Sequence, residues 1–314
     1  MSLVVAGVPF QALIREQDSE LIDRFVAPFV ADQKASWIGC MALSETEHGS
    51  DSFALGSPEF RYPTIAGEVV AKSKGEHYAI DGAKADWISN GSIATHALAS
   101  VAIWPSKGLS SRALAFIPLD LAGVSRGEPL NKLGQRELNQ GAIVFQQVRV
   151  PRSFILINDG YEIALSRLLA YTSSCMAAVF TGVARAAYEE ALSHPERRVQ
   201  GGTAISEHQL VQKRLFDMFA KVEACRALSR EVFSYEQKAD VPSLEHAIAA
   251  KTFCTQAAFE VANDALELFG VRGVSRGSLV EKLFRDARLS LIEKGENDVL
   301  SLVGANQILQ HHTV

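Results

Sequence analysis

Residues 254–270 read Cys-Thr-Gln-Ala-Ala-Phe-Glu-Val-Ala-Asn-Asp-Ala-Leu-Glu-Leu-Phe-Gly, and this stretch decides the second half of the fold. Its apolar residues recur every three or four positions, which is the period of one helix face. They are Cys254, Ala258, Val261, Ala265 and Leu268. Gly270 follows as a helix stop signal. Residues 215–225 repeat the period, so the chain after Pro151 is predicted to form an antiparallel helical bundle with short connections.

Before Pro151 the helical period gives way to short apolar runs that are typical of strands. The predicted strands cover residues 38–43, 67–71, 77–80, 97–104, 113–118 and 142–150. Clusters of Gly, Pro, Ser and Asn separate them, and Lys74 with Gly75 predicts a hairpin turn. The middle of the chain is therefore predicted to be a compact antiparallel β domain or barrel.

A short helical pattern precedes the strands, over residues 11–33. It is too short to bury much apolar surface alone. The sequence thus predicts an α+β multidomain protein. Residues 1–36 are a residual N-terminal helical segment, residues 37–152 the middle β domain and residues 153–314 the helical bundle.

Composition excludes several classes of protein. The chain of 314 residues has a net charge of −5 and no block of like charges, which argues against nucleic acid or an anionic membrane as its main partner. No apolar run approaches the roughly eighteen residues of a membrane span, and residues 1–10 lack the basic start of a signal peptide. The four cysteines match no metal or disulfide spacing. We expect them to be buried and reduced, in a cytoplasmic protein without a metal site.

Two segments of the predicted β domain could hold a planar ligand. Residues 41–51, Met-Ala-Leu-Ser-Glu-Thr-Glu-His-Gly-Ser-Asp, place a polar loop after an apolar strand. Such a loop offers hydroxyl and backbone N–H groups to an anion or a heteroaromatic ring, although a surface turn is the more common explanation of this pattern. Residues 81–90 place Trp87 and Ser89 beside a turn, which suits a planar cofactor. The alternative is a core tryptophan at a strand end.

Two segments of the predicted bundle carry charge. Residues 197–202, Arg-Arg-Val-Gln-Gly-Gly, place two arginines before a glycine pair that is expected to open a helix. This pattern suits a pyrophosphate or a solvated loop. Residues 284–298 place Arg285 and Arg288 on a helix that breaks near Gly295 among carboxylates. A carboxylate there could act as a base, or the charged groups could simply face water.

The order and spacing of these segments closely resemble the acyl-CoA dehydrogenase family. The series is Leu-Ser-Glu-x-x-x-Gly-Ser-Asp, Gly-x-Lys-x-x-Trp-Ile-Ser-Asn, Lys-Leu-Gly at 132–134, Val-Arg-Val-Pro-Arg at 148–152, Arg-x-Gln-x-Gly with His-Gln, and Arg-Asp-Ala-Arg. The likeness runs from about Asp18 to the C-terminus. It implies a middle β domain followed by a helical bundle, in agreement with the periods.

The resemblance implies FAD as cofactor. The expected flavin contacts in the β domain are Met41, Leu43, Ser44, Gly49, Ser50, Trp87 and Ser89. Ser50 would also lie near the thioester of the substrate. Ser89 replaces the usual threonine and keeps a hydroxyl for flavin N5. In the bundle, Arg198, Gln200, Gln209, Glu267 and Gly270 resemble residues that reach the FAD of a neighbouring subunit.

The resemblance also implies a reaction and partners. A base removes the α-proton of an acyl thioester, and the β-hydrogen leaves as hydride to the flavin. The substrate is an acyl-CoA or an acyl-carrier protein, and an electron-transfer flavoprotein or similar acceptor takes the electrons. The implied setting is fatty acid metabolism, with self-association into a dimer or homotetramer.

Three departures from the family pattern lie on the acyl side of the flavin. Lys294 occupies the position of the catalytic glutamate, and Thr172 occupies the alternative base position. Glu293 and Glu296 flank Lys294, but each could act as a base only if the local backbone is rewound, since neighbours on a helix point about 100° apart. The simpler alternative is that Lys294 forms a surface ion pair with Glu293 or Glu296. The third departure is a shortened N-terminal helical domain, which would leave the acyl site open.

A weaker departure affects the residues that are expected to bind the FAD of the neighbouring subunit. Gly201 stands where a phenylalanine is common, and Glu267 and Val271 stand where a glutamine and a glycine are common. A negative charge at Glu267 would weaken binding of a dinucleotide.

The sequence therefore leaves three hypotheses: a dehydrogenase, alone or with a second dehydrogenase subunit that supplies the glutamate; a flavin-dependent monooxygenase on the same scaffold; or a non-catalytic partner of an active homologue.

Overall fold

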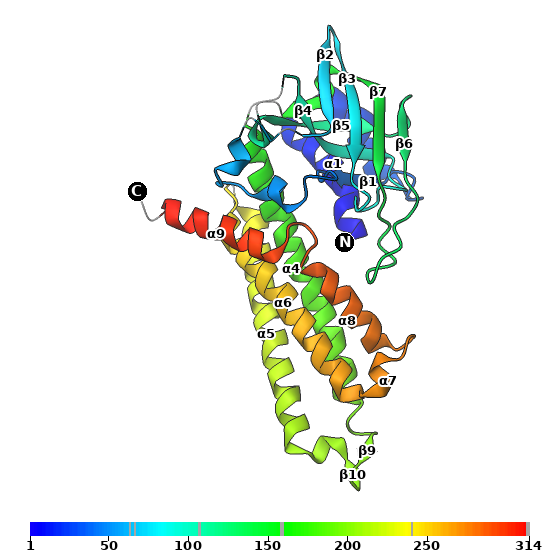
Figure 1. Cartoon of the computed structure of the whole chain (residues 1–314), viewed down its shortest axis with the longest axis vertical. Coiled ribbons are helices and arrows are strands. Elements are labelled where there is room, and N and C mark those ends of the chain that lie inside the picture. The colour runs from blue at the N-terminus through cyan, green and yellow to red at the C-terminus, as the bar shows by residue number, and fades with distance from the viewer. Residues whose placement is uncertain (63, 66, 106–107, 158–159, 240, 312–314) are drawn as a thin grey trace. The chain divides into compact units, whose positions relative to one another are not determined.

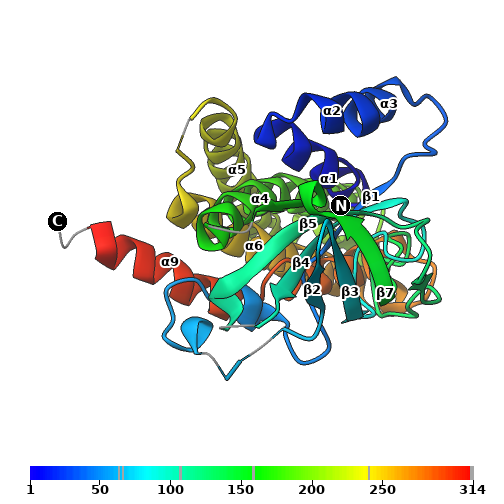
Figure 2. The same cartoon turned by 90° about the horizontal axis from the view of Figure 1, so that it is seen from above.

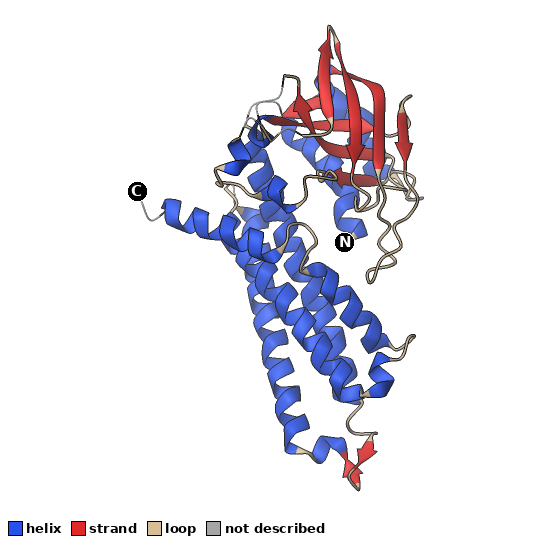
Figure 3. Cartoon of the chain, in the orientation of Figure 1, coloured by secondary structure: helices blue, strands red, loops and turns tan. Residues whose placement is uncertain are grey.

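The computed structural model describes residues 1–62, 64–65, 67–105, 108–157, 160–239 and 241–311 (Figure 1). The chain divides into two compact units. Unit 1 comprises Met1–Asn131 and Arg136–Ser166, and unit 2 comprises Lys132–Gln135 and Arg167–Val314. Strands gather in unit 1, whereas unit 2 is helical apart from one short hairpin (Figure 3).

Unit 1 contains a mixed sheet of eight strands in the order β6-β7-β3-β2-β4-β5-β8, with β1 paired to β4. The strands are β1 Gly39–Ala42, β2 Val70–Lys74, β3 His77–Lys84, β4 His96–Ile103, β5 Arg112–Pro118, β6 Val124–Arg126, β7 Ile143–Pro151 and β8 Ile155–Ile157. Figure 2 shows β5, β4, β2, β3 and β7 side by side. The predicted strands are confirmed with shifted ends.

The prediction of a purely antiparallel sheet is wrong, because β4 pairs in parallel with both β1 and β2. Apolar runs do not reveal strand direction, and parallel pairing arises here because long connections return the chain in the same sense. The predicted hairpin is confirmed: β2 and β3 pair antiparallel around Gly75, whose φ of +70° suits glycine.

The N-terminal segment packs on the sheet of unit 1. Its helices are α1 Ser2–Glu16, α2 Ser19–Leu21, a π-turn Ile22–Val26 and α3 Ala27–Ala31. Helix α1 begins nine residues before the predicted pattern and contains Pro9, and a proline within a helical pattern usually indicates a helix boundary. It lies so close to β1 that a Cβ on Gly39 would come 2.3 Å from the Ala6 carbonyl oxygen.

Unit 2 is a bundle whose central helix, α6 (Leu244–Phe269), packs against α5 (Gln209–Lys238), α8 (Leu279–Ser290) and α9 (Asn297–His311). The predicted stop is confirmed, since α6 ends at Gly270 with φ 59°. Helix α7 (Val271–Val274) follows. Among the described helices, α4 (Tyr161–Ser193) is the one whose length and hydropathy could cross a membrane, but 61% of its apolar window is buried inside the protein. A buried core helix explains this composition.

Two of the sequence motifs meet within unit 2. The Lys-Leu-Gly segment contacts α8 so closely that a Cβ on Gly134 would lie 2.2 Å from the Arg285 carbonyl oxygen. Arg285 donates to the Leu133 carbonyl at 2.7 Å, and the Gln135 N–H donates to the Asp286 carboxylate. The Arg-Asp-Ala-Arg motif therefore holds this segment in place.

Candidate flavin site and catalytic loop

The first predicted flavin-binding segment leaves the end of β1. Met41 and Leu43 are buried, whereas Ser44, Gly49 and Ser50 are half-buried. The loop closes through hydrogen bonds between the backbone groups of Glu45 and His48. No described atom lies within 4 Å of where a Cβ on Gly49 would stand, so the loop has open space beside it.

A buried ion cluster lies behind this loop. The Glu45 carboxylate accepts from Lys84 Nζ at 2.7 Å and from Arg112 Nη2 at 2.7 Å, and all three side chains are at most 1% exposed. The backbone N–H of Glu68 also donates to it at 2.7 Å. Because Glu45 belongs to the Leu-Ser-Glu motif and Lys84 to the Gly-x-Lys motif, the cluster joins the two predicted flavin-binding segments.

The same cluster fixes the backbone that the flavin is expected to meet. The Leu43 carbonyl accepts from Lys84 Nζ at 3.3 Å and from Ser100 Oγ at 3.0 Å, and the Ala85 N–H donates to the Ser44 carbonyl at 3.2 Å. Sequence reasoning missed this role of Lys84. The available signal was a lysine and an arginine at the ends of otherwise apolar strands.

Electrostatics keep the cluster charged at neutral pH. Burial opposes ionisation of Glu45, but Lys84 and Arg112 outweigh it and hold the pKa of this carboxyl below its usual value. Burial lowers the pKa of Lys84 to about 8, although the charge of Glu45 counteracts it. A buried pair of this kind depends on both partners, since removal of one leaves an uncompensated charge.

The second predicted segment presents an aromatic face and a hydroxyl. Trp87 is 45% exposed, an unusual state for an indole, while Ser89 is 3% exposed. The backbone of Ser89 forms a bridge with Gln140. An exposed ring two residues from a serine fits a planar ligand with a hydrogen-bonding edge.

Part of the predicted dinucleotide-binding segment in unit 2, with Arg198 and Gln200, lies at a tight hairpin. β9 (Val199–Gln200) pairs with β10 (Thr203–Ala204), and Gly201 and Gly202 both have positive φ in the turn. The expectation that this glycine pair opens a helix is wrong, because α5 begins only at Gln209. Two consecutive glycines suit a two-residue hairpin turn better than a helix start.

A basic cluster forms at this end of the bundle. His194 stacks on Phe269 with ring centroids 4.0 Å apart. Burial, together with the charges of Arg198, Arg272 and Arg197, lowers the pKa of His194. Within unit 2, the predicted residue Arg198 therefore lies among cations that could hold an anion such as a pyrophosphate.

The charge of Glu267 is neutralised within unit 2. Its carboxylate accepts from Arg214 Nη1 at 2.8 Å and from Asn263 Nδ2 at 3.1 Å. The sequence predicts that the negative charge of Glu267 weakens dinucleotide binding, and these contacts reduce that effect. Gly270 follows at the end of α6, and Val271 is 80% exposed.

The candidate catalytic residues occupy a turn between α8 and α9. Lys294 is half-buried and has φ 59°, and Gly295 follows with φ 98°. Glu293 or Glu296 was expected to act as a base only if the backbone here leaves the helical conformation. Residues 291–296 form a turn and are not helical, so this requirement is met. Thr172 offers no base: it is buried, and its hydroxyl donates to the Leu168 carbonyl of its own helix at 2.9 Å.

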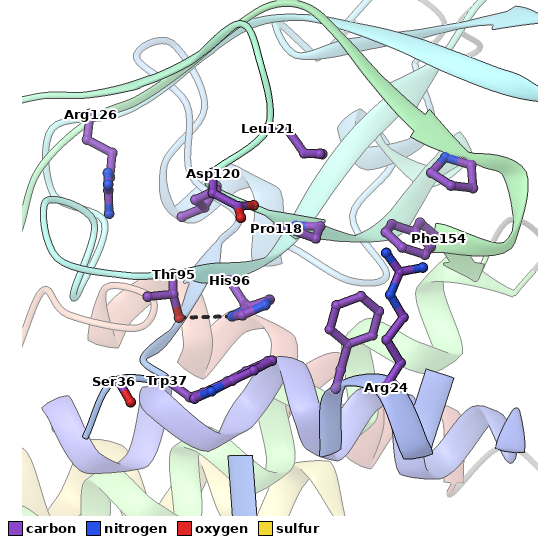
Figure 4. A pocket seen from close by; sticks show the side chains of 13 residues that line it. Arg24, Ser36, Trp37, Thr95, His96, Pro118, Asp120, Leu121, Arg126 and Phe154 are labelled. Atoms are coloured by element: carbon purple, nitrogen blue, oxygen red, sulfur yellow. Dashed lines mark hydrogen bonds between the residues drawn. The ribbon is translucent and has the colours of Figure 1, made fainter. Parts of the chain in front are cut away.

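A cavity of about 540 Å³ in unit 1 is lined by none of the predicted site residues (Figure 4). Trp37 stacks on His96 at 4.6 Å, and Thr95 bonds the imidazole at 2.9 Å. Burial lowers the pKa of His96 to about 4 despite the nearby Asp120, so this histidine is neutral at physiological pH. The cavity is separate from the flavin-facing residues.

Comparison with known proteins decides the family. Residues 40–148 match the acyl-CoA dehydrogenase middle domain, and residues 158–309 match the acyl-CoA dehydrogenase C-terminal domain. The chain belongs to the acyl-CoA dehydrogenase family. Members of this family are FAD-dependent oxidoreductases, so the predicted fold class, cofactor and enzyme class are confirmed.

Relatives and solved structures agree with this assignment. A probable acyl-CoA dehydrogenase of Mycobacterium tuberculosis is 29% identical over 294 residues, which cover 93% of this chain and 72% of the relative. The cyclohexane-1-carbonyl-CoA dehydrogenase of Geobacter metallireducens is 28% identical over 313 residues, with 99% and 77% covered. The structure of butyryl-CoA dehydrogenase from Megasphaera elsdenii has a TM-score of 0.87 at 24% identity, with 98% and 77% covered, and shows the shared fold.

Proposed function

We propose that this acyl-CoA dehydrogenase family member binds FAD and catalyses α,β-dehydrogenation of an acyl thioester. The observation that carries the proposal is the exposed Trp87 ring two residues from the buried Ser89, in the segment that resembles the flavin contacts of the family. The ion cluster behind residues 43–45 supports it, because this cluster holds the two flavin-facing segments together. FAD supplies a hydride acceptor when bound.

The remaining residues have proposed roles on the protein side. Leu43, Ser44, Ser50, Trp87 and Ser89 would hold the flavin ring, with Ser50 also near the thioester. The backbone of Met41 and Gly49 would shape the loop. Arg198, Gln200, Gln209, Glu267 and Gly270 would reach the FAD of a neighbouring subunit, which implies self-association as a dimer or tetramer. We place the reaction in cytoplasmic acyl thioester metabolism, with an electron-transfer flavoprotein or similar acceptor.

The test is anaerobic reduction of the bound flavin by a panel of thioesters. The purified chain is mixed with butyryl-CoA, cyclohexane-1-carbonyl-CoA and an acyl-carrier protein loaded with the same groups. We expect at least one of them to bleach the visible bands of the flavin within seconds. If the protein carries flavin but no thioester reduces it, with or without a second dehydrogenase chain, the proposed reaction is wrong.

A hetero-oligomer is the second candidate, and a specific observation favours it. Neither of the two family base positions carries a carboxylate, since they hold Lys294 and the bonded Thr172. In this version a second dehydrogenase subunit supplies the glutamate, or this chain is its non-catalytic partner. An inert wild-type chain that becomes active as Lys294→Glu would support it. Activity of the wild-type chain alone would exclude it.

A further inference from the structure

The cavity of unit 1 lies at the opposite end of β1 from the predicted flavin-binding loop. β1 and β4 run parallel, with Gly39 opposite His96. Trp37 and His96 line the cavity where this pair of strands begins, whereas the loop that contains Ser44 leaves β1 at its other end. The length of β1 alone separates the two places by about 10 Å. All residues that line the cavity belong to unit 1, so the cavity is complete within that unit.

The buried wall of the cavity consists largely of rings. Phe25 and Phe154 are at most 5% exposed, and their rings meet edge to face with centroids 5.6 Å apart. Trp37 stacks on His96 at 4.6 Å with an angle of 6° between the planes, and His96 stacks on Phe116 at 5.4 Å. Because aromatic rings pack well against one another, such a wall favours a ligand with a flat apolar group.

Charged side chains lie at the exposed side of the same cavity. Arg24, Asp120 and Arg126 are all exposed, and Figure 4 shows Asp120 between the two arginines. His96 adds no charge at neutral pH, because burial lowers its pKa to about 4. The lining thus has one positive charge in excess, which favours a ligand with a single negative charge.

Arg24 is the arginine that is better placed to bind this charge. Its guanidinium carbon lies 5.0 Å from the centroid of the Phe25 ring and 5.8 Å from that of Phe154 (Figure 4). A guanidinium that lies over a ring can still donate from its in-plane N–H groups, whose geometry matches a carboxylate. Arg126 differs, because its Nη1 already donates to the Ala94 carbonyl at 2.5 Å.

We propose that this cavity binds a small aromatic carboxylate, with the carboxylate on Arg24 and the ring against Trp37 and Phe154. The volume of about 540 Å³ lies within the range of about 300–1,000 Å³ for pockets that hold small molecules. None of the residues predicted to contact the flavin or the thioester lines the cavity. The site is therefore additional to the proposed function and does not depend on it.

The first experiment is a titration of the full chain with 3-phenylpropionate, followed by NMR of the probe, with and without saturating FAD. We expect the probe to bind at least about tenfold more tightly than its neutral amide, which cannot form a charged pair with arginine. Hexanoate, which lacks the ring, should bind about 2–10-fold more weakly than the probe. FAD should leave the affinity of the probe unchanged.

Three results of this titration would overturn the proposal. They are no binding of 3-phenylpropionate, equal affinity for the probe and its amide, and displacement of the probe by FAD, which would place it at the flavin site. Because the titration is also run without FAD, a chain that binds no flavin would remove the proposed function and leave this test intact.

The second experiment replaces the proposed anchor. Arg24→Met keeps an apolar stem and should weaken binding of the probe by at least about tenfold, while the affinity for the amide changes by less than about twofold. Arg24→Lys keeps the charge without the planar group and should recover part of the loss. Arg15→Met is the control, since Arg15 is exposed at the end of α1 and does not line the cavity. Unchanged binding in Arg24→Met, or an equal loss in Arg15→Met, contradicts the assignment.

The third experiment tests the sign of the ligand charge. Asp120→Asn removes the negative charge between the two arginines and should tighten binding of 3-phenylpropionate by about two- to fivefold. Asp120 is exposed, so this change should affect stability little. Phenethylamine, the cationic counterpart of the probe, should bind the wild type no better than the amide does. Tighter binding of this amine than of the probe, or weaker binding of the probe in Asp120→Asn, would show that the cavity prefers a cation.

Discussion

Replacement of Glu45 by alanine is expected to lower the free energy of unfolding of unit 1 by about 3–5 kcal/mol. The change leaves Lys84 and Arg112 buried without their anion, and each is at most 1% exposed. It also removes the acceptor of the Glu68 N–H. Since the cluster fixes the Leu43 carbonyl, the variant should lose FAD as well as stability. Urea unfolding and the flavin content after gel filtration measure the two effects.

Glu47→Ala is the matched control for this experiment. Glu47 lies two residues away in the same loop, and its side chain is exposed. A surface substitution of this kind usually changes stability by less than about 0.5 kcal/mol. If Glu45→Ala behaves like Glu47→Ala, the ion cluster does not stabilise the flavin-facing loop.

The second large effect is a dependence of stability on pH that comes from Lys251. This lysine is fully buried on α6, and its Nζ donates to the Gly295 carbonyl at 2.8 Å. Its folded pKa of about 8 lies below the usual lysine value of 10.5. Between pH 8 and pH 10.5 the unfolded chain therefore binds more protons at Lys251 than the folded chain does. The contribution of Lys251 to stability rises with pH across this window and is lost as the pH falls through 8. The full window corresponds to about 3 kcal/mol. We expect the stability of wild type relative to Lys251→Met to rise by about 2–3 kcal/mol from pH 7 to pH 10.

Urea unfolding followed by circular dichroism of the helical signal measures this difference at each pH. Subtraction of the Lys251→Met curve removes the titration of groups that both proteins share. Lys221→Met provides the comparison for a lysine in a partly exposed pair. A difference that stays flat from pH 7 to pH 10 would show that the pKa of Lys251 is not lowered in the folded chain.

Much of the fold follows from the sequence for a simple physical reason. The period of apolar residues reports which side of an element is buried, as in α6, where Cys254, Ala258 and Val261 all face the core. The start of α1 is harder to predict, because Pro9 inside the helix suggests a break at this point. The period of apolar residues is also silent on strand direction, because β1 and β4 would show the same pattern in parallel or antiparallel pairing.

The candidate site, like the fold, can be predicted from the sequence only in part. Residue types and spacing identify Trp87, Ser89 and the turn at Lys294. They do not reveal the ion cluster, because Lys84 and Arg112 meet Glu45 only through the pairing of distant strands. They also do not separate Glu293 from Glu296. The Glu296 carboxylate accepts from backbone N–H groups at the start of α9, whereas both Glu293 oxygens are buried, and both are tertiary facts.

We propose that this chain holds FAD through the two joined segments of unit 1. The most direct measurement is the visible absorption spectrum of the purified protein, after addition of FAD and gel filtration, for wild type and Ser89→Ala with Trp87→Ala. We expect the bands of bound oxidised flavin in the wild type and their loss or marked weakening in the double variant. A wild-type protein without flavin bands would contradict it, and so would a double variant that retains FAD fully.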